Sequence, residues 1–292
     1  MPGNNTLPMS RHQGNPTHHM TLPHWCAEAL RRGEIWIVWA LCALGLAAIP
    51  LVQGQASVIW DTLNHHIYLG WIAERQRFDQ DFLAAGWQSY QYPYLYWPAY
   101  KLAVAGFSGV AAGVVLALLQ SLAAPPVWLV ARSLCPGDRA QDIAMRWLAV
   151  ALAFSGGVTL SLVDTTSNDL LAGIPLVWAI ALGLVAHDAG RPPRSRTRLV
   201  VLSGLLAGVS VACKLSNGPL ALAMPVLWAL GGGGARAAAW RIALAGAATV
   251  LGFAVAYAPW GWQMWHQFGN PVYPFYDPSF DPLRALLGWQ RP

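Results

Sequence analysis

An acidic residue and two neighbouring histidines open the most polar segment of the sequence. Asp61, His65 and His66 lie close together, with Asn64 and Tyr68 on either side of the histidine pair. A carboxylate can act as a general base, and an imidazole can act as a base or as a metal ligand. From spacing alone, an N-cap of the following helix is the better explanation for Asp61, and apolar packing explains either histidine at least as well. Because adjacent helical residues point about 100° apart, we expect at most one histidine to face a given site.

A second acidic motif follows in the same segment. Asp79 and Asp81 flank Gln80, and Arg77 lies just before them. Two carboxylates on an extended loop can share a divalent cation through their oxygen atoms, although a solvated turn explains the pair as well. The candidate metal ligands of this motif are Asp79 and Asp81, and the candidate cofactor is a divalent cation.

Polar residues also lie at the ends of apolar stretches farther along the chain. Asn168 and Asp169 close the polar run 164–169, which can also be explained as a capping sequence for the next helix. Lys214 follows a Gly- and Ala-rich helix, where its ammonium suits the helix macrodipole and equally suits the phosphate of a lipid. Asn217 is close enough in sequence to donate to the same phosphate.

Aromatic residues accompany these polar groups. Tyr92 belongs to a dense aromatic run in the segment 53–100, and Asn270 lies in the aromatic segment 269–276, where two prolines exclude a helix. Tyr and Trp prefer the membrane–water interface, where one end of the side chain is apolar and the other is wet. We therefore expect segment 53–100 to be a folded loop at a membrane surface, with segment 269–276 as a lid or platform beside it.

The composition indicates lipid as the solvent for much of the chain. Of the 292 residues, 55% are hydrophobic and 11% are charged, whereas soluble domains carry about 25% charged residues. The net charge of +5 is typical of the positive-inside bias, and its dispersal between apolar runs argues against nucleic-acid binding. The four cysteines lack metal-ligand spacing and are expected to be free thiols. No P-loop, serine nucleophile elbow or zinc motif is present.

The hydropathy pattern predicts an all-α fold, a polytopic transmembrane helix bundle of about seven spans with an amphipathic first outer loop. Residues 1–34 are expected to form a disordered cytoplasmic tail. Residues 35–260 are expected to form the transmembrane module, including the outer loop 53–100, and residues 261–292 a further outer-face loop. A signal peptide is the rival interpretation of the first apolar stretch, but the further spans favour a signal anchor. The expected spans are Ile35–Val52, Phe107–Leu134, Trp147–Val163, Leu170–Ala186, Leu199–Cys213, Pro219–Leu230 and Ile242–Trp260.

Charge determines the expected orientation. Arg-rich, acid-poor connections alternate along the chain with connections that carry acidic residues, and the positive-inside rule places the Arg-rich set in the cytoplasm. The N-terminus is then cytoplasmic. Mixed polar and apolar patterns predict helices in the first outer loop at Thr62–Glu74 and Tyr94–Val104. The segments that share the outer face are 53–100, 164–169, Lys214–Gly218 and 261–292.

Four segments of the chain resemble the GT-C superfamily of polytopic glycosyltransferases, above all its bacterial multi-span members, which use polyprenyl-phosphate-sugar donors. Asp61–Tyr68 is similar to an Asp…Asn-Tyr-His…Tyr opening of the family's first outer loop, with His65 in place of the Tyr. Arg77–Asp81, together with Tyr92-Pro93 and Pro98, resembles an acidic motif followed by Tyr-Pro. Lys214–Asn217 resembles a Lys-Leu-Thr-Asn pattern. Phe268–Phe275 resembles a Gly-Asn-Pro-Leu-Phe-Pro-Phe pattern.

The resemblance implies inverting transfer of a hexosyl unit to an acceptor at the periplasmic face of a bacterial inner membrane. The implied partners are the lipid bilayer, a polyprenyl-phosphate sugar and an acceptor of unspecified chemistry. Asp61 matches the family's catalytic acidic residue, which acts directly or through a metal, and Lys214, Arg77 and Asn217 would bind the donor phosphate. Family members continue with further spans, so the module is expected to be incomplete at its C-terminus. The implied substrate-binding residues are Asn64, His65, His66, Tyr68, Asp79, Asp81, Tyr92, Asn168, Asp169 and Asn270.

Two other functional classes stay open. A transporter or channel subunit predicts ionisable residues in the middle of spans, whereas the ionisable residues here cluster at the outer boundary. A membrane assembly protein without catalysis predicts that replacing Asp61 with alanine has no effect on activity.

Overall fold

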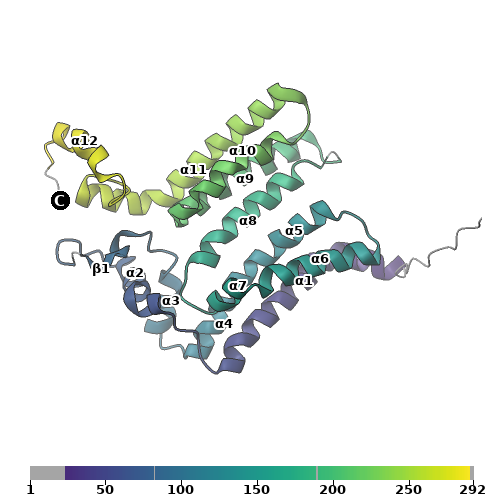
Figure 1. Cartoon of the computed structure of the whole chain (residues 1–292), viewed down its shortest axis with the longest axis horizontal. Coiled ribbons are helices and arrows are strands. Elements are labelled where there is room, and N and C mark those ends of the chain that lie inside the picture. Colours follow the sequence, from purple (N-terminus) through teal and green to yellow (C-terminus); the bar gives the residue numbers. More distant parts are fainter. Residues whose placement is uncertain (1–23, 82, 189, 290–292) are drawn as a thin grey trace, which may run out of the picture.

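The structure of the protein, a computed structural model, describes residues 24–81, 83–188 and 190–289 and is predominantly α-helical, as predicted (Figure 1). Most of the predicted tail, residues 1–23, lies outside the described residues. The boundary predicted at residue 34 falls inside a helix that begins at His24. The boundary predicted at residue 260 falls inside a helix that ends at Phe268.

Long helices form the body of the molecule, and each overlaps one of the predicted spans. They are α1 (His24–Gln53), α4 (Gly109–Gln120) followed by α5 (Ala124–Leu134), α6 (Ala140–Ser155) followed by α7 (Gly157–Leu162), α8 (Asp169–Val185), α9 (Pro193–Cys213), α10 (Gly218–Ala229) and α11 (Gly234–Phe268).

Four helical segments of the described residues are long and apolar enough to cross a membrane, namely Gly33–Gln53, Gly109–Leu134, Pro193–Cys213 and Gly234–Phe268. The predicted count of about seven spans is thus not confirmed. Gly156, in an extended conformation, separates α6 from α7, and α10 has only 12 residues, fewer than the roughly 20 that a span needs. Apolar side chains such as Leu222 (82% exposed) and Val255 (68% exposed) face outward from the bundle, which agrees with a surrounding of lipid.

The helices form a chain of packed neighbours that runs from α1 to α11. α1 packs on α4 and α5, α5 on α8, α8 on α9, and α9 on α11. Ser203 and Ser210 of α9 donate hydrogen bonds to carbonyls of α8, at 2.6 and 2.8 Å. Small residues allow α9 and α11 to approach closely, as in many membrane helix pairs. A Cβ atom at Gly208 would lie 2.6 Å from the backbone nitrogen of Phe253.

Gly208→Val is therefore expected to force α9 away from α11 and to lower the free energy of unfolding by about 1–3 kcal/mol, as overpacking does in cores. Thermal unfolding of the purified protein in detergent measures this. Gly246→Ala is the matched control, because a Cβ atom at Gly246 meets nothing within 4 Å. Equal melting temperatures for both variants would contradict the close packing of α9 on α11.

The remaining short elements gather at one end of the bundle, at the left of Figure 1. The predicted helices of the first outer loop are confirmed, one as a π-helical turn followed by an α-helix and the other from Trp97 onward. These elements are η1 (Thr62–His66), α2 (Ile67–Ile72), the short strand β1 (Ala84–Trp87), η2 (Gln88–Tyr90) and α3 (Trp97–Val104), and near the C-terminus η5 (Asp277–Phe280) and α12 (Asp281–Leu286).

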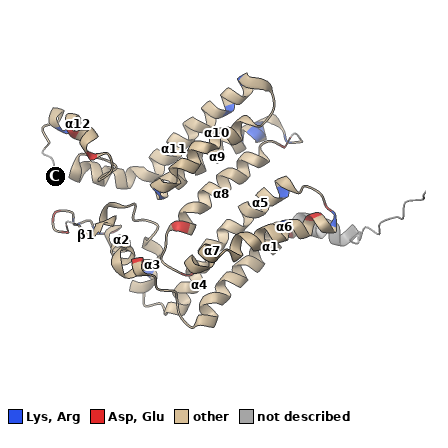
Figure 2. Cartoon of the chain, in the orientation of Figure 1, with Lys and Arg blue, Asp and Glu red and all other residues tan. Residues whose placement is uncertain are grey.

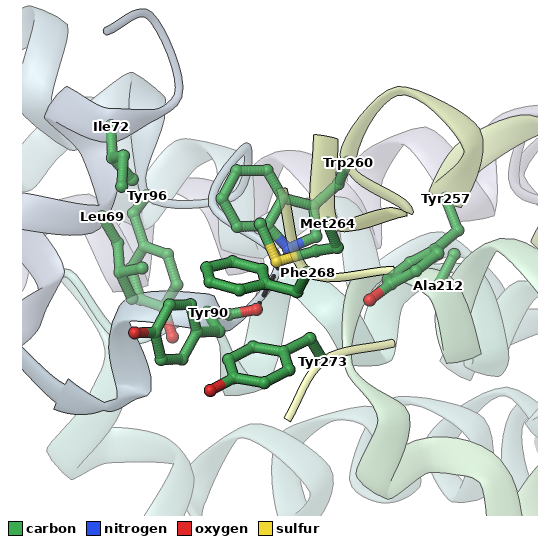
Figure 3. Close-up of a cluster of buried hydrophobic side chains, with 10 residues drawn as sticks. All are labelled: Leu69, Ile72, Tyr90, Tyr96, Ala212, Tyr257, Trp260, Met264, Phe268 and Tyr273. Atoms are coloured by element: carbon green, nitrogen blue, oxygen red, sulfur yellow. Dashed lines mark hydrogen bonds between the residues drawn. The ribbon is translucent and has the colours of Figure 1, made fainter. Parts of the chain in front are cut away.

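A cluster of buried aromatic side chains fastens the first loop to α11 (Figure 3). Trp260 donates its indole N–H to the carbonyl of Tyr90 at 3.0 Å. Phe268 stacks on Tyr273 with ring centroids 4.1 Å apart, and Tyr90 packs edge-on against both rings. The loop is therefore a packed part of the fold, not a flexible connection.

Candidate functional site

Both histidines of the first loop are buried, contrary to the expectation that at most one faces a site. His65 and His66 are 6% and 5% exposed, and their ring centroids lie 4.5 Å apart. The reason is the backbone: residues Thr62–His66 form a π-helical turn, which is wider than an α-helical turn and is frequent at functional sites. The ring of Tyr96 packs against both imidazoles.

Asp61 stands at the start of this turn but does not cap it. Its side chain makes no capping hydrogen bond and is half-exposed. The carboxylate instead faces His65, with Oδ1 3.7 Å from Nδ1. The capping explanation of Asp61 is therefore not supported.

A chain of hydroxyl groups holds His66 in place. Nδ1 of His66 and Oγ1 of Thr166 share a hydrogen bond of 2.7 Å, and Oγ1 of Thr166 lies 2.7 Å from that of Thr62. Nearby, the backbone N–H of Ser57 donates to Asp164 at 3.0 Å. The polar run 164–169 thus binds the first loop directly, which its composition alone did not reveal.

Burial favours the neutral form of both imidazoles. Burial lowers the pKa of His65, against the opposing charge of Asp61. Burial, reinforced by the neighbouring His65, lowers the pKa of His66 to about 4. A neutral imidazole carries a free nitrogen lone pair, so these groups can accept a proton or bind a metal.

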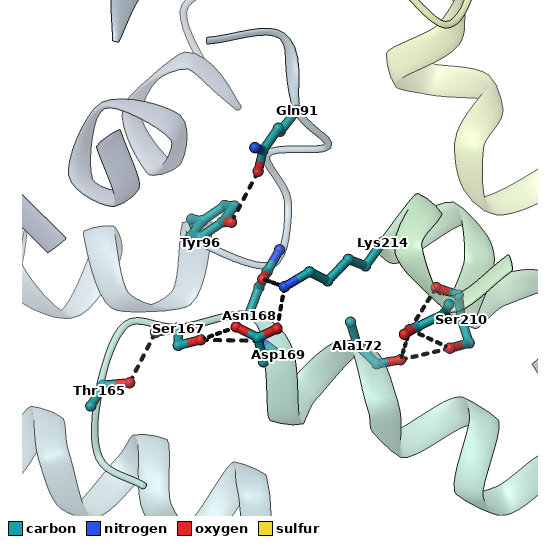
Figure 4. Close-up of polar contacts among 10 residues, drawn as sticks. Gln91, Tyr96, Thr165, Ser167, Asn168, Asp169, Ala172, Ser210 and Lys214 are labelled. Atoms are coloured by element: carbon teal, nitrogen blue, oxygen red, sulfur yellow. Dashed lines mark hydrogen bonds and ion pairs between the residues drawn. The ribbon is translucent and has the colours of Figure 1, made fainter. Parts of the chain in front are cut away.

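Lys214 joins the polar run from the opposite side (Figure 4). Its ammonium donates to Oδ1 of Asn168 at 3.2 Å and forms an ion pair with Asp169. Burial would raise the pKa of Asp169, but hydrogen bonds from Lys214 and Ser167 outweigh it and lower that pKa. Lys214, Asn168 and Asp169, which belong to two segments predicted to share one face of the bundle, are thus in contact in the structure.

A cavity of about 170 Å³ lies beside Lys214. Asn168 and Lys214 form its polar wall, and Tyr92, Tyr257 and Phe275 form an aromatic wall. Tyr92 stacks on Tyr257 and donates its hydroxyl to the carbonyl of Ala256 at 3.3 Å. The cavity therefore joins the first loop, the polar run, the end of α9 and the segment after α11.

Tyr96 and Gln91, which the sequence did not single out, connect the cavity with the histidine pair. The hydroxyl of Tyr96 donates to Oε1 of Gln91 at 3.5 Å, and Gln91 lines the cavity (Figure 4). His66 is also close enough to Asp169 and Lys214 for their charges to act on its pKa. The ring of Tyr96 is thus flanked by the histidine pair on one side and by the polar side chains around Lys214 on the other.

Arg77, Asp79 and Asp81 form a separate turn. Arg77 donates to Gln80 at 2.7 Å and pairs with Asp81 at 3.5 Å, while Asp79 accepts from Gln80. None of the three lines the cavity. Asp61 is likewise not grouped with Asp79 and Asp81: within the described part of the chain, the cluster of potential metal ligands is Asp61 with His65 and His66.

Asn217 and Asn270 are occupied by structural hydrogen bonds. The amide nitrogen of Asn217 donates to the carbonyl of Ala172 at 3.1 Å and to the hydroxyl of Ser210 at 2.8 Å, which joins α8 to α9. Asn270 is fully buried, and its amide fixes the turn around Phe275. The side-chain amides of Asn217 and Asn270, which were predicted to bind a ligand, therefore have no free N–H group in this arrangement.

Two other predicted residues lie in the first loop without contacting the cavity. Asn64 is exposed. The hydroxyl of Tyr68 is buried without a hydrogen-bond partner, and burial together with the charge of Asp81 raises the pKa of Tyr68 to about 12. The three cysteines that the structure describes, Cys42, Cys135 and Cys213, are free thiols, as predicted.

Comparison with family models, with curated proteins and with solved structures finds no match for this chain.

Proposed function

We propose that this chain is the membrane module of a glycosyltransferase that takes its sugar from a polyprenyl-phosphate donor. One observation carries the proposal: two sets of groups converge at one end of an apolar helix bundle, beside a cavity with an aromatic wall. They are the cation of Lys214, which directly follows α9, and a carboxylate with two imidazoles on the first loop. An apolar bundle suits the polyprenyl chain, the cation suits its phosphate, and aromatic faces suit a sugar ring.

The distribution of charge supports an outward-facing site. Many of the Lys and Arg residues lie at the end of the bundle opposite the first loop (Figure 2), and positive residues favour the cytoplasmic side. In this proposal the first loop is periplasmic, the N-terminus is cytoplasmic, and the shorter helices α6–α7, α8 and α10 complete about seven spans by packing within the bundle.

The proposed reaction is an inverting displacement. Asp61, directly or through a metal, takes the proton of an acceptor hydroxyl, whose oxygen forms a bond to the anomeric carbon. The bond from that carbon to the phosphate oxygen breaks, and polyprenyl phosphate leaves with the electron pair. Lys214 stabilises the charge that develops on the phosphate, which requires its ammonium to exchange Asp169 for the donor.

Lys214→Ala is expected to weaken binding of a polyprenyl-phosphate hexose by about 10- to 100-fold, the value of a charged hydrogen bond. Equilibrium binding to purified protein in detergent measures this. Arg77→Ala is the matched control, because Arg77 pairs with its own turn and does not line the cavity. No binding to folded wild-type protein, or equal loss in both variants, would contradict the proposed donor site.

A further inference from the structure

We propose that Asp61, His65 and His66 form a binding site for a divalent transition-metal cation, and that Zn²⁺ is the cation which this ligand set fits. From the sequence, Asp61, Asp79 and Asp81 were candidate ligands of a cation, and an imidazole was a separate candidate ligand. The structure groups Asp61 with the ring nitrogens of His65 and His66, and not with Asp79 and Asp81. Where this inference bears on catalysis it rests on the proposed function, but metal binding itself is tested without any sugar donor.

The distances suit a shared cation. One potential ligand atom from each of the three side chains lies within 4.8 Å of the other two. Oδ1 of Asp61 and Nδ1 of His65 are 3.7 Å apart, too far for a hydrogen bond. Two ligands that each lie about 2.0–2.1 Å from a tetrahedral zinc are about 3.3 Å apart. A shift of a few tenths of an ångström would therefore bring Oδ1 of Asp61 and Nδ1 of His65 to the separation expected of two zinc ligands.

His65 provides the independent indication of a ligand. Its side chain is 6% exposed, and its Nδ1 atom is buried with no hydrogen-bond partner. An unsatisfied buried polar atom costs about 1–3 kcal/mol, so such atoms are rare unless something binds them. A cation between Nδ1 and the carboxylate of Asp61 would satisfy both groups.

His66 is already oriented as metal-binding histidines are. With Nδ1 hydrogen-bonded to Thr166, its Nε2 atom is the nitrogen left for a metal. Ligating histidines almost always use their second nitrogen in this way, and the partner fixes the orientation of the ring. Thr166 and Thr62 are thus the positioning residues of the site.

The chemistry of the ligand set determines the class of metal. Mg²⁺ and Ca²⁺ prefer oxygen ligands, whereas two imidazoles and one carboxylate suit Zn²⁺ and other transition metals. Three protein ligands leave a fourth position open, as in catalytic rather than structural zinc sites.

Zinc titration of the metal-free protein in detergent, with elemental analysis after gel filtration, tests the site. The wild-type protein is expected to retain one more equivalent of zinc than the Asp61→Asn variant or the His65→Phe variant. Asp79→Asn and His266→Ala are matched controls, since Asp79 lies outside the cluster and His266 is exposed on α11. His12, His18, His19 and His24 give a background that all these proteins share. Thr166→Val is expected to weaken zinc binding by about 10–100-fold without removing a ligand.

Zinc content that is equal in wild type and Asp61→Asn would overturn the proposal, and so would displacement of the zinc by a large excess of Mg²⁺. Asp61 is half-exposed, so its variant is expected to fold, and circular dichroism checks the helical content. A variant that loses the zinc site can still bind the donor, and a variant that loses donor binding can still bind zinc, because Lys214 holds the donor and is not a ligand of the metal. The two assays therefore test this inference and the proposed function separately.

Discussion

Asp61→Asn is expected to lower sugar transfer by about 10²–10⁴-fold, the usual contribution of a general base. Asparagine keeps the shape of the side chain but cannot accept the proton of an acceptor hydroxyl. Because the Asp61 side chain makes no capping hydrogen bond and is half-exposed, the fold and membrane insertion should not change. Initial rates with a polyprenyl-phosphate hexose and a panel of hydroxyl acceptors, at saturating donor, measure the effect.

Asp79→Asn is the control for this change. Asp79 is also an exposed acid of the first loop, but it contacts only its own turn, so the rate should stay within about twofold of wild type, as for a typical surface substitution. Full activity of Asp61→Asn would remove Asp61 from the mechanism. Loss of activity together with unchanged zinc content would assign Asp61 to direct proton transfer without a metal.

Arg146→Ala is expected to lower the free energy of unfolding by about 3–5 kcal/mol, the cost of leaving a buried charge without its partner. The guanidinium binds both carboxylate oxygens of Glu34, at 2.9 and 2.7 Å, and also donates to the carbonyls of Cys135 and Gly137. The two side chains are 1% and 2% exposed. Denaturant or thermal unfolding in detergent measures the loss.

Two comparisons make this prediction specific. Arg132 and Asp138 form a more exposed pair in the same region, so Arg132→Ala should cost about 1 kcal/mol or less. Replacing both Glu34 and Arg146 with leucine removes both charges, and this double variant should be more stable than Arg146→Ala alone. A double variant as unstable as the single one would attribute the effect to packing and not to the unpaired charge.

The helices could be predicted from the sequence because their signal is local. Apolar runs such as 35–52 and 107–134 must form helices in lipid, where every backbone group needs a partner within the segment. The start of α1 at His24 and the break at Gly156 were not predicted. The charged residues Glu34 and Arg146 show what hydropathy leaves out: they are buried against each other, in a contact between residues far apart in the sequence.

The site was predictable in part. Lys214, Asn168 and Asp169 were expected on one face because they end or begin apolar stretches, and the structure brings their side chains into contact. The pairing of the two histidines was not predictable, because a hydropathy pattern does not distinguish a π-helical turn from an α-helical turn. Asn217 and Asn270 carry suitable amides, but the carbonyl of Ala172 on another helix occupies the first and the carbonyl of Phe275 in the same turn occupies the second. Residue type alone does not reveal either hydrogen bond.

The ion pair between Lys214 and Asp169 has a consequence for selectivity. An anion that takes the place of Asp169 at the ammonium must compete with a carboxylate held there by the fold, which acts as a tethered competitor at a high effective concentration. Small free anions such as inorganic phosphate are therefore expected to bind weakly at this ammonium. A ligand with additional attachment points elsewhere is expected to overcome the competitor, which would give selectivity against simple anions without any steric gate.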